Sequence, residues 1–301
     1  MFTRLRRKLH WKHGLIGGGA LGSVVVGAVL LLPGCLPPEM KQASDAVAHL
    51  NRQSYPVSIS DRQLEVRYLA TGDPNGPRVL LIHGTPGEAE NWGFLLADPP
   101  PGVEVVAVDR PGFGQTTPKR EVVRLEDQAA ALAPLLVDRQ GKKTIVVGHS
   151  YGGPVAAQLA VDYPDRVGGL VMAAAALDPD LERILWYQHV GEWLSWAIPD
   201  DLKHTNREIF ALEDELRGLA PRLAEITTPI EIIHGTDDEL VPYENVPYMS
   251  AGFTGPERLR VTRLEGANHF LPWLHTPALR EAIDRLLESP GEAEADPEAA
   301  P

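Results

Sequence analysis

The chain contains two kinds of apolar pattern, and each predicts a different kind of β-strand. Between residues 54 and 71 apolar and polar positions alternate on either side of Ser60-Asp61-Arg62, which is typical of an antiparallel hairpin with one face in water. From residue 78 onward the apolar residues form short continuous runs instead, at 78–83, 103–108, 144–147, 167–175, 230–233 and 259–264. Strands buried on both faces have this character. Their alternation with helical stretches predicts an α/β fold, with a mostly parallel, helix-flanked sheet and antiparallel N-terminal edge strands.

Helical patterns account for most of the remaining sequence. Four helices are expected to cover the sheet, at residues 88–97, 124–138, 154–162 and 277–288. Residues 177–228 carry a helical pattern without a strand signal, which favours an inserted helical lid over the carboxyl edge of the sheet. The lid would divide the core into residues 54–176 and 229–289. Residues 36–53 are interpreted as a short tether or amphipathic segment, and residues 290–301, rich in Glu, Ala and Pro, as a disordered acidic tail.

The first 35 residues have the layout of an export signal. A basic stretch from Arg4 to Lys12 precedes an apolar run at residues 14–32, which leads into Leu32-Pro33-Gly34-Cys35. These last four residues resemble the bacterial lipobox, in which a small residue precedes a cysteine that becomes lipid-modified and forms the new N-terminus. Gly34 and Leu32 fit that motif, while Pro33 is unusual in it.

Two other interpretations of this leader stay open. The 19 residues at 14–32 are close to the ~20 that span a bilayer, so the segment could remain as an uncleaved signal anchor, or it could be a buried or chance apolar segment. Both membrane interpretations place the body outside the cytoplasmic membrane, in the bacterial cell envelope, because the basic flank stays inside.

Composition limits the class of function. With 301 residues and 44% hydrophobic content, the chain can build one large domain or two small ones. Its net charge is −13, and without the basic leader the 23 basic and 41 acidic residues that remain give −18. Such a surface would repel nucleic acid, so no nucleic-acid partner is expected. A single cysteine excludes an intramolecular disulfide and a cysteine-rich metal site.

The strongest chemical signal surrounds Ser150. The apolar run at 144–147 continues into Gly148-His149-Ser150-Tyr151-Gly152 and then into a helical stretch. This strand, G-x-S-x-G motif and helix form the sequence context of a nucleophile elbow, whose sharp turn needs Gly148 and Gly152 to be nearly free of side-chain atoms. A glycine-rich turn with a bystander serine is the alternative, as in dinucleotide-binding folds, but no G-x-G-x-x-G follows a strand here.

Three motifs at successive strand ends resemble the α/β-hydrolase superfamily. They are His83-Gly84-Thr85-Pro86-Gly87, Asp109-Arg110-Pro111-Gly112-Phe113-Gly114 and Gly148-His149-Ser150-Tyr151-Gly152. The resemblance covers residues 54–288. Within the superfamily, the chain is similar to lidded serine esterases, proline iminopeptidases and cofactor-free haloperoxidases. It implies that the catalytic acid and histidine follow the nucleophile in the chain.

The resemblance also indicates the acid and the base. The loop Gly235-Thr236-Asp237-Asp238 matches the family's acid loop and selects Asp238, with Asp237 and Asp178 as alternatives. A carboxylate at this position can fix the tautomer of an imidazole. The loop Gly266-Ala267-Asn268-His269 matches the family's G-x-x-H loop and selects His269 as the base, with His275 as the fallback.

The oxyanion hole requires two backbone N–H donors. Tyr151, directly after the nucleophile, is expected to supply one, and Thr85 the other, because Pro86 has no N–H. Asp109 and Arg110 are interpreted as structural residues that hold the neighbouring loop closed.

The expected reaction is two-step acyl transfer through a covalent Ser150 intermediate, without a metal or organic cofactor. A serine nucleophile argues against haloalkane dehalogenases and epoxide hydrolases of this fold, which use aspartate. The favoured substrate is an apolar ester. A peptidase of the proline iminopeptidase kind, a carbon-carbon bond hydrolase, a haloperoxidase and a catalytically inactive binding protein stay as alternatives. Four tryptophans could line an apolar acyl pocket, although packing also explains them: Trp92, Trp186, Trp193 and Trp196.

Overall fold

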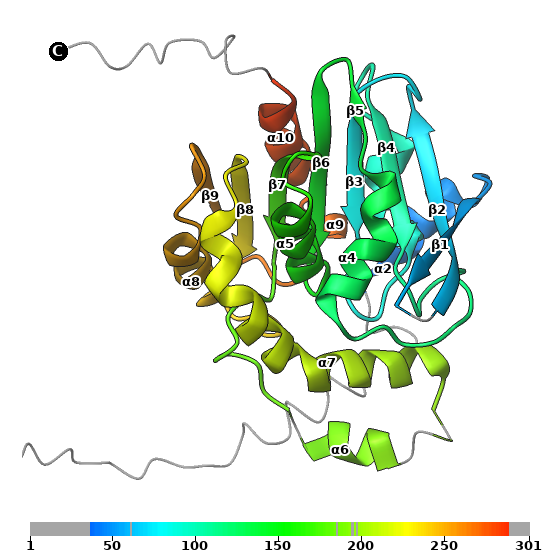
Figure 1. Ribbon diagram of the computed structural model, residues 1–301, viewed down its shortest axis with the longest axis vertical. Coiled ribbons are helices and arrows are strands. Elements are labelled where there is room, and N and C mark those ends of the chain that lie inside the picture. Colours follow the sequence, from blue (N-terminus) through cyan, green and yellow to red (C-terminus); the bar gives the residue numbers. More distant parts are fainter. Residues whose placement is uncertain (1–36, 61, 185, 194–195, 197, 289–301) are drawn as a thin grey trace, which may run out of the picture. The chain divides into compact units, whose positions relative to one another are not determined.

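A nine-stranded sheet forms the centre of the computed structural model, which describes residues 37–60, 62–184, 186–193, 196 and 198–288 (Figure 1). The strands follow the order β1-β2-β4-β3-β6-β7-β8-β9, and β5 pairs with β6. From β4 to β9 along this path the strands pair in parallel, whereas β1 and β2 are antiparallel. The strands are β1 (Gln53–Ile59), β2 (Arg62–Gly72), β3 (Arg78–Ile82), β4 (Glu104–Asp109), β5 (Asp138–Arg139), β6 (Lys142–His149), β7 (Val167–Ala173), β8 (Ile230–Gly235) and β9 (Leu259–Leu264).

The burial of most strands follows their apolar patterns, but β9 does not: the run at 259–264 was expected to be buried on both faces, and it is partly exposed along its length because it lies at an edge of the sheet. β3, β4 and β8 are buried along their whole length, as their continuous apolar runs predict. β1 alternates between exposed and partly buried positions, because it is an edge strand. The expected α/β class, with a mostly parallel sheet and antiparallel N-terminal edge strands, is therefore confirmed.

Helices cover both faces of the sheet. One apolar cluster joins the sheet to α4 (Leu125–Leu132), η2 (Ala133–Leu135), α5 (Gly152–Asp162) and α8 (Asn245–Gly252). A second cluster joins the other face to η1 (Ala89–Trp92), α3 (Gly93–Ala97), α9 (Leu271–Leu274) and α10 (Thr276–Leu287). The four helices expected over the sheet all form, with ends that differ by one to a few residues.

Residues 38–47 form a helix, α2 (Pro38–Val47), that packs on the body of the protein. Ala43 and Val47 are buried, and α2 contacts α3 and η1. A Cβ atom at Gly93 would lie 1.8 Å from the carbonyl oxygen of Ala43, so the two backbones are in direct contact. The segment predicted as a tether or amphipathic segment is therefore an amphipathic helix that belongs to the folded body.

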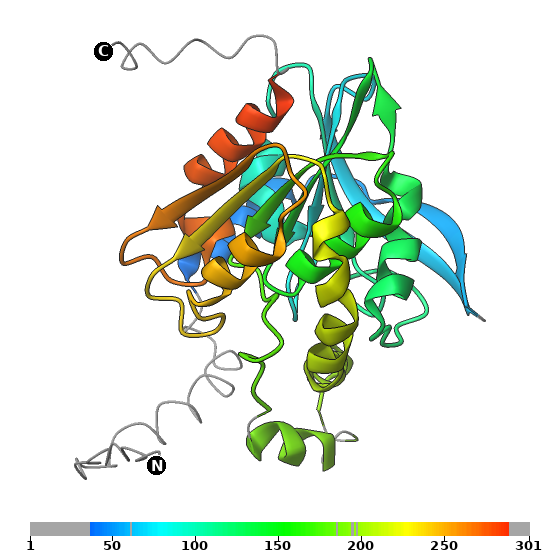
Figure 2. The same ribbon diagram turned by 60° about the vertical axis from the view of Figure 1, so that its left-hand side comes forward.

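Helical elements also fill the insertion between β7 and β8. They are α6 (Trp186–Trp193), α7 (Asp200–Leu219) and η3 (Ala220–Glu225). α7 crosses beyond the carboxyl ends of the central strands, and α6 lies on the far side of α7 from the sheet (Figures 1 and 2). The insertion is thus helical, as its pattern predicts, and its action as a lid stays a prediction.

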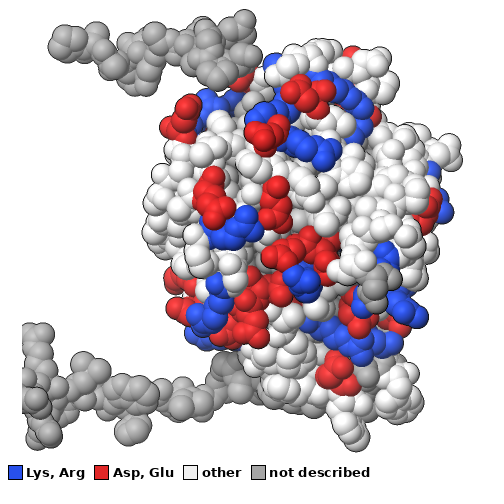
Figure 3. Space-filling view, viewed as in Figure 1, with Lys and Arg blue, Asp and Glu red and all other residues white. Residues whose placement is uncertain are grey.

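Several predictions concern residues outside the described part of the chain. They are the export leader with Cys35 and the acidic tail at 290–301. Within the described residues, none of the helices has both the length and the hydropathy required to cross a bilayer. On the face shown in Figure 3, acidic and basic side chains are intermixed.

Candidate active site

Ser150 lies in the turn between β6 and α5, with the left-handed backbone φ of +55°. A Cβ atom at Gly148 would lie 2.3 Å from the carbonyl oxygen of Gly152, and one at Gly152 would lie 2.3 Å from that of Ile82. Both separations are far shorter than van der Waals contact, so the turn requires glycine at both positions. Strain at a non-glycine residue and a strand–turn–helix context are the geometry of a nucleophile elbow.

The Ser150 backbone is anchored while its hydroxyl is not. Its N–H donates to the carbonyl of Ala173 at 3.1 Å, and its own carbonyl accepts from Gly153 at 2.9 Å. Among the described residues the half-buried Ser150 hydroxyl makes no hydrogen bond. The Ser150 hydroxyl oxygen is thus held by a rigid turn, and its own hydrogen-bonding capacity is unused among the described residues.

Asp238 and His269 come together from the loops that follow β8 and β9. The Nδ1 atom of His269 lies 2.7 Å from Oδ2 of Asp238, and both residues are buried. The other carboxylate oxygen accepts from the N–H groups of Leu240 at 2.9 Å and Val241 at 2.8 Å. Burial alone would raise the pKa of Asp238, but His269 and the Val241 N–H hold it below its ordinary value. The ionised carboxylate fixes the His269 proton on Nδ1 and leaves Nε2 as an acceptor.

The alternative acids and the alternative base lie elsewhere. The Asp237 side chain is exposed and accepts from the Thr236 hydroxyl at 3.1 Å. The Asp178 carboxylate accepts from the Asp180 N–H at 3.0 Å, within its own loop. The ring that hydrogen-bonds Asp238 belongs to His269 and not to His275, and His234 Nε2 lies 3.6 Å from the same carboxylate oxygen.

His149 connects the nucleophile turn to the His269 loop. Its Nε2 atom lies 3.0 Å from the His269 carbonyl oxygen and must carry the proton, because a carbonyl only accepts. The two imidazole rings are 4.8 Å apart between centroids. Burial, together with the nearby charge of His269, lowers the pKa of His149 to about 3. Ser150 is therefore the direct neighbour of a neutral ring that contacts His269.

The two expected oxyanion donors flank Ser150. Tyr151 is the next residue in the chain, and a Cβ atom at Gly84, the neighbour of Thr85, would lie 2.9 Å from the Ser150 Cβ. Among the described residues neither the Thr85 N–H nor the Tyr151 N–H donates a hydrogen bond. A buried donor, on Tyr151, and a partly buried one, on Thr85, are thus left available for a developing negative charge.

Asp109 holds the loops around this edge of the sheet. It is fully buried and accepts from the N–H groups of Ala89 at 2.8 Å and Gln115 at 2.9 Å, and from Arg52 Nε at 2.8 Å. Its bonds all go to neighbouring loops, which is what a structural residue does.

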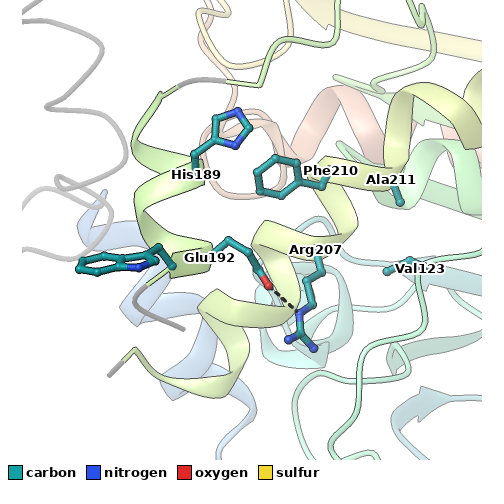
Figure 4. A pocket seen from close by; sticks show the side chains of 7 residues that line it. Val123, His189, Glu192, Arg207, Phe210 and Ala211 are labelled. Carbon is teal, nitrogen blue, oxygen red and sulfur yellow. Dashed lines mark ion pairs between the residues drawn. The ribbon is translucent and has the colours of Figure 1, made fainter. Parts of the chain in front are cut away.

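The four predicted pocket tryptophans are not brought together. Trp92 is buried beneath the site, with its ring edge-on to His149 at 6.4 Å, whereas Trp193 and Trp196 are 78% and 84% exposed. The Trp186 side chain lies outside the described part of the structure. Trp193 does line an open groove of about 520 Å³ between α6 and α7, with Val123, His189, Glu192, Arg207, Phe210 and Ala211 (Figure 4). Ser150, Asp238 and His269 do not line this groove.

Comparison with known proteins agrees with this geometry. A family model described as the alpha/beta hydrolase fold matches residues 77–208, which include the elbow. This match shows the α/β-hydrolase fold for that part of the chain. The proteins that resemble the chain have varied activities.

Three relatives illustrate that variety. The chain is 42% identical over 104 residues to the dihydrolipoyllysine-residue acetyltransferase component of the acetoin cleaving system of Cupriavidus necator, covering 35% of this chain and 28% of that protein. It is 24% identical to the 2-hydroxy-6-oxononadienedioate/2-hydroxy-6-oxononatrienedioate hydrolase of Cupriavidus pinatubonensis, covering 75% of this chain and 92% of that protein. An esterase structure from Thermogutta terrifontis superposes with a TM-score of 0.53 at 20% identity, covering 78% of this chain and 98% of the esterase. The chain spans about a third of the length of the first curated relatives that it matches.

Sequence reasoning gave no role to His149, Gln128 or Glu208, all of which are buried at this edge. Glu208 carried a signal, because it shares one face of α7 with Leu212 and Leu216. An acid in an apolar stripe needs a partner. Gln128 has no comparable signal.

Proposed function

We propose that this protein is a serine hydrolase that cleaves a carboxylic ester through an acyl-enzyme. Ser150 is the nucleophile, His269 the general base and acid, and Asp238 the residue that orients the imidazole. The observation that carries the proposal is the 2.7 Å contact between His269 Nδ1 and Asp238 Oδ2, beside a strained serine turn. A buried carboxylate, an imidazole and a serine in this relation are the components of nucleophilic acyl transfer.

Each step follows from the positions of the protons. His269 Nε2, free of a proton, removes the hydroxyl proton of Ser150 as the oxygen attacks the ester carbonyl carbon. Asp238 stabilises the imidazolium that forms, and the imidazolium then protonates the alcohol that leaves. Water activated by the same Nε2 atom attacks the acyl-enzyme and releases the acid. The N–H groups of Thr85 and Tyr151 would receive the negative charge that develops on the carbonyl oxygen in both steps.

Fluorophosphonate labelling tests the nucleophile. Purified wild type should be labelled at Ser150 and should hydrolyse chromogenic p-nitrophenyl esters, while Ser150→Ala should do neither above background. Thr236→Ser, which keeps a partly buried hydroxyl in the acid loop, should behave as wild type. An unlabelled wild type, or equal labelling of Ser150→Ala, would overturn the proposal.

A graded ester panel identifies the acyl group. Acetyl, butyryl, octanoyl and palmitoyl esters measured side by side give kcat/KM as a function of chain length, and aminoacyl anilides provide the peptidase contrast. A higher kcat/KM for proline or leucine anilide than for every ester would replace the ester assignment with a peptidase.

A second candidate is hydrolysis of a carbon-carbon bond. It is supported by the alignment with the Cupriavidus pinatubonensis hydrolase, which extends over 75% of this chain. The discriminating assay follows the loss of the absorbance of a 2-hydroxy-6-oxo dienoate. Turnover of the dienoate with negligible turnover of every ester would favour this candidate.

We further propose that the leader of residues 1–35 exports the protein and tethers its body outside the cytoplasmic membrane of a bacterial cell, with Cys35 lipidated. The support is the order of basic, apolar and Leu32-Pro33-Gly34-Cys35 segments. Intact mass and palmitate labelling of wild type and Cys35→Ser test it. A mature protein that retains residues 1–34 without label would contradict lipidation and favour an uncleaved anchor.

A further inference from the structure

Arg110 is an arginine with no solvent exposure that lies directly behind the nucleophile turn. A buried guanidinium must have partners for its N–H groups, because an isolated buried charge is very unfavourable. Each of its three nitrogens donates: Nε to the His83 carbonyl at 2.9 Å, Nη2 to the Gly84 carbonyl at 2.8 Å, and Nη1 to Gln128 Oε1 at 2.8 Å. Two of these acceptors belong to the loop that carries the expected oxyanion donor Thr85.

The Gly84 carbonyl is held from a second side by His83. The backbone N–H of Arg110 donates to His83 Nε2 at 3.0 Å, so the ring proton of His83 is on Nδ1. That Nδ1 atom lies 2.7 Å from the same Gly84 carbonyl and donates to it. Burial and the nearby guanidinium hold the pKa of His83 well below its ordinary value, which keeps the ring neutral in this tautomer.

Holding the Gly84 carbonyl determines the direction of the Thr85 N–H. The two groups belong to one planar peptide unit, and in a trans peptide the C=O and N–H bonds point in opposite directions. With the carbonyl oxygen fixed towards Arg110 and His83, the N–H points to the other side. Gly84 itself is packed against Ser150, since a Cβ atom there would lie 2.9 Å from the Ser150 Cβ.

The inserted helix α7 supplies the counter-charge. Glu208 is also without solvent exposure, and its carboxylate pairs with Arg110 through Nη1 at 2.6 Å and Nη2 at 3.1 Å. Gln128 Nε2 donates to the same carboxylate at 2.7 Å. A second link runs from α7 to the loop, because the Thr85 hydroxyl donates to the Thr205 hydroxyl at 3.1 Å.

The guanidinium also contacts the residue that carries the other oxyanion donor. Its central carbon lies 4.7 Å from the centroid of the Tyr151 ring and 4.8 Å from that of Phe113. One side chain therefore contacts both parts of the expected oxyanion hole, through the Gly84 carbonyl on one side and the Tyr151 ring on the other.

We propose that Arg110 and Glu208 are positioning residues for the oxyanion hole. Glu208 on α7 orients the Arg110 guanidinium, and the guanidinium fixes the Gly84–Thr85 peptide so that the Thr85 N–H faces the carbonyl oxygen of the substrate. This role rests on the proposed acyl-transfer function. It makes the inserted helix α7 part of the apparatus that stabilises the transition state, through contacts that do not touch the substrate.

The test measures kcat per active site, after titration of the sites with a fluorophosphonate. Removal of one oxyanion donor lowers kcat by ~100- to 1000-fold. In Glu208→Gln the Thr85 donor would be misdirected but still present, so kcat should fall by about 10- to 100-fold. KM for the ester should change by less than about threefold, because the donor acts mainly on the charge that develops in the transition state. A trifluoromethyl ketone, whose adduct places an oxyanion in the hole, should bind more weakly by about the same factor as kcat falls.

The matched control is Glu104→Gln, at the opposite end of the sheet. It neutralises a buried carboxylate that lies 2.6 Å from Arg78 Nε. It should lower the melting temperature while leaving kcat per titrated site and the affinity for the ketone unchanged. If Glu208 had a purely structural role, Glu208→Gln would behave in the same way. It would have fewer titratable sites, each with a normal kcat.

The double variant Arg110→Met with Glu208→Leu separates charge burial from positioning. Removing both charges should recover most of the melting temperature lost in Glu208→Gln, because no unpaired buried charge remains. The kcat should stay low, because the Gly84 carbonyl has lost its guanidinium donor. Recovery of kcat with stability would overturn the proposal.

The outcomes also separate this inference from the function on which it rests. A wild type that is neither labelled nor active overturns the acyl-transfer function, and this role with it. A labelled and active wild type, with Glu208→Gln equal to it in kcat per site and ketone affinity, overturns the positioning role alone.

Discussion

The two ends of the parallel strands both contain buried ion pairs, but the pairs differ in what they leave unbonded. At the amino ends, Arg78 donates to Glu104 at 2.6 Å and to the Leu135 carbonyl at 2.9 Å, and Arg139 donates to the same carboxylate. These charged groups bond one another and the neighbouring backbone, and none of them belongs to the candidate active site. At the carboxyl ends, the pairing of Asp238 with His269 Nδ1 leaves Nε2 as an acceptor, and within the described part of the chain the Thr85 N–H, next to the Gly84 carbonyl that Arg110 holds, donates to no group.

This difference teaches how to separate a structural ion pair from a functional one in the same fold. Burial and short distances occur at both ends, so neither distinguishes them. What distinguishes the carboxyl ends is that the fixed groups there leave donors and an acceptor unused among the described residues. Changes at the carboxyl ends should therefore affect turnover, and changes at the amino ends should affect stability alone.

The largest expected effect comes from Asp238→Asn. The amide would donate to His269 and favour the wrong imidazole tautomer, so kcat on a p-nitrophenyl ester should fall by about 10³- to 10⁴-fold with little change in the melting temperature. The control is Asp237→Asn, the exposed neighbour, which should remain within twofold of wild type. Equal losses in the two variants would contradict the assignment of Asp238.

Gly152→Ala should be the next largest, and it acts on stability. The new methyl carbon would lie 2.3 Å from the Ile82 carbonyl oxygen, so β3 and the elbow must separate, at a cost of about 3 kcal/mol or more in urea-induced unfolding. Gly218→Ala is the matched control on α7, where a Cβ atom meets nothing within 4 Å. That control should stabilise the protein by roughly 0.5–1 kcal/mol. A Gly152→Ala protein of wild-type stability and kcat would show that the elbow is looser than described.

Glu182→Gln tests a carboxyl whose electrostatic environment is unlike that of Glu104. Burial, followed by repulsion from Asp178 and Glu213, raises the pKa of Glu182 to about 7 from its usual 4.5. The folded state then binds the proton more tightly than the unfolded state. The free energy of unfolding therefore falls as pH rises from 4.5 to 7, and the loss is complete above pH 7.

The neutral amide should therefore raise the free energy of unfolding by about 1–3 kcal/mol at pH 8 and by nothing at pH 4. Urea titrations at both pH values measure the difference, with the exposed Glu257→Gln as control. A gain that is the same at pH 4 and pH 8 would exclude charge as its cause.

The sequence predicted what depends on local pattern. The buried strands follow from continuous apolar runs, and the need for Gly148 and Gly152 follows from the sharpness of the turn, so both were predictable before any contact was known. Asp238 and His269 could be selected because each stands in a short loop motif directly after a strand. A shift of one residue in the match to the family's acid loop would have selected Asp237 in place of Asp238. The structure brings Asp238 to His269.

What the sequence could not predict depends on side-chain direction and on distant partners. The four tryptophans were grouped because they are aromatic, but Trp92 lies under His149 while Trp193 and Trp196 face outward. Nothing in the local pattern states the direction of an aromatic ring on a helix. Likewise Arg110 was expected to be structural, but its counter-charge is 98 residues away in the insertion.

The helix α2 determines where the protein can be shortened. Its backbone packs directly on Gly93, and Arg52, just after it, donates to Asp109 at 2.8 Å and to Glu90 at 2.6 Å. A recombinant form that begins at Ser54 would lose the α2 packing and the Arg52 hydrogen bonds, and it would uncover the apolar side of η1 and α3. A form that begins before Pro37 keeps the helix and is the better choice for crystallisation and kinetic work.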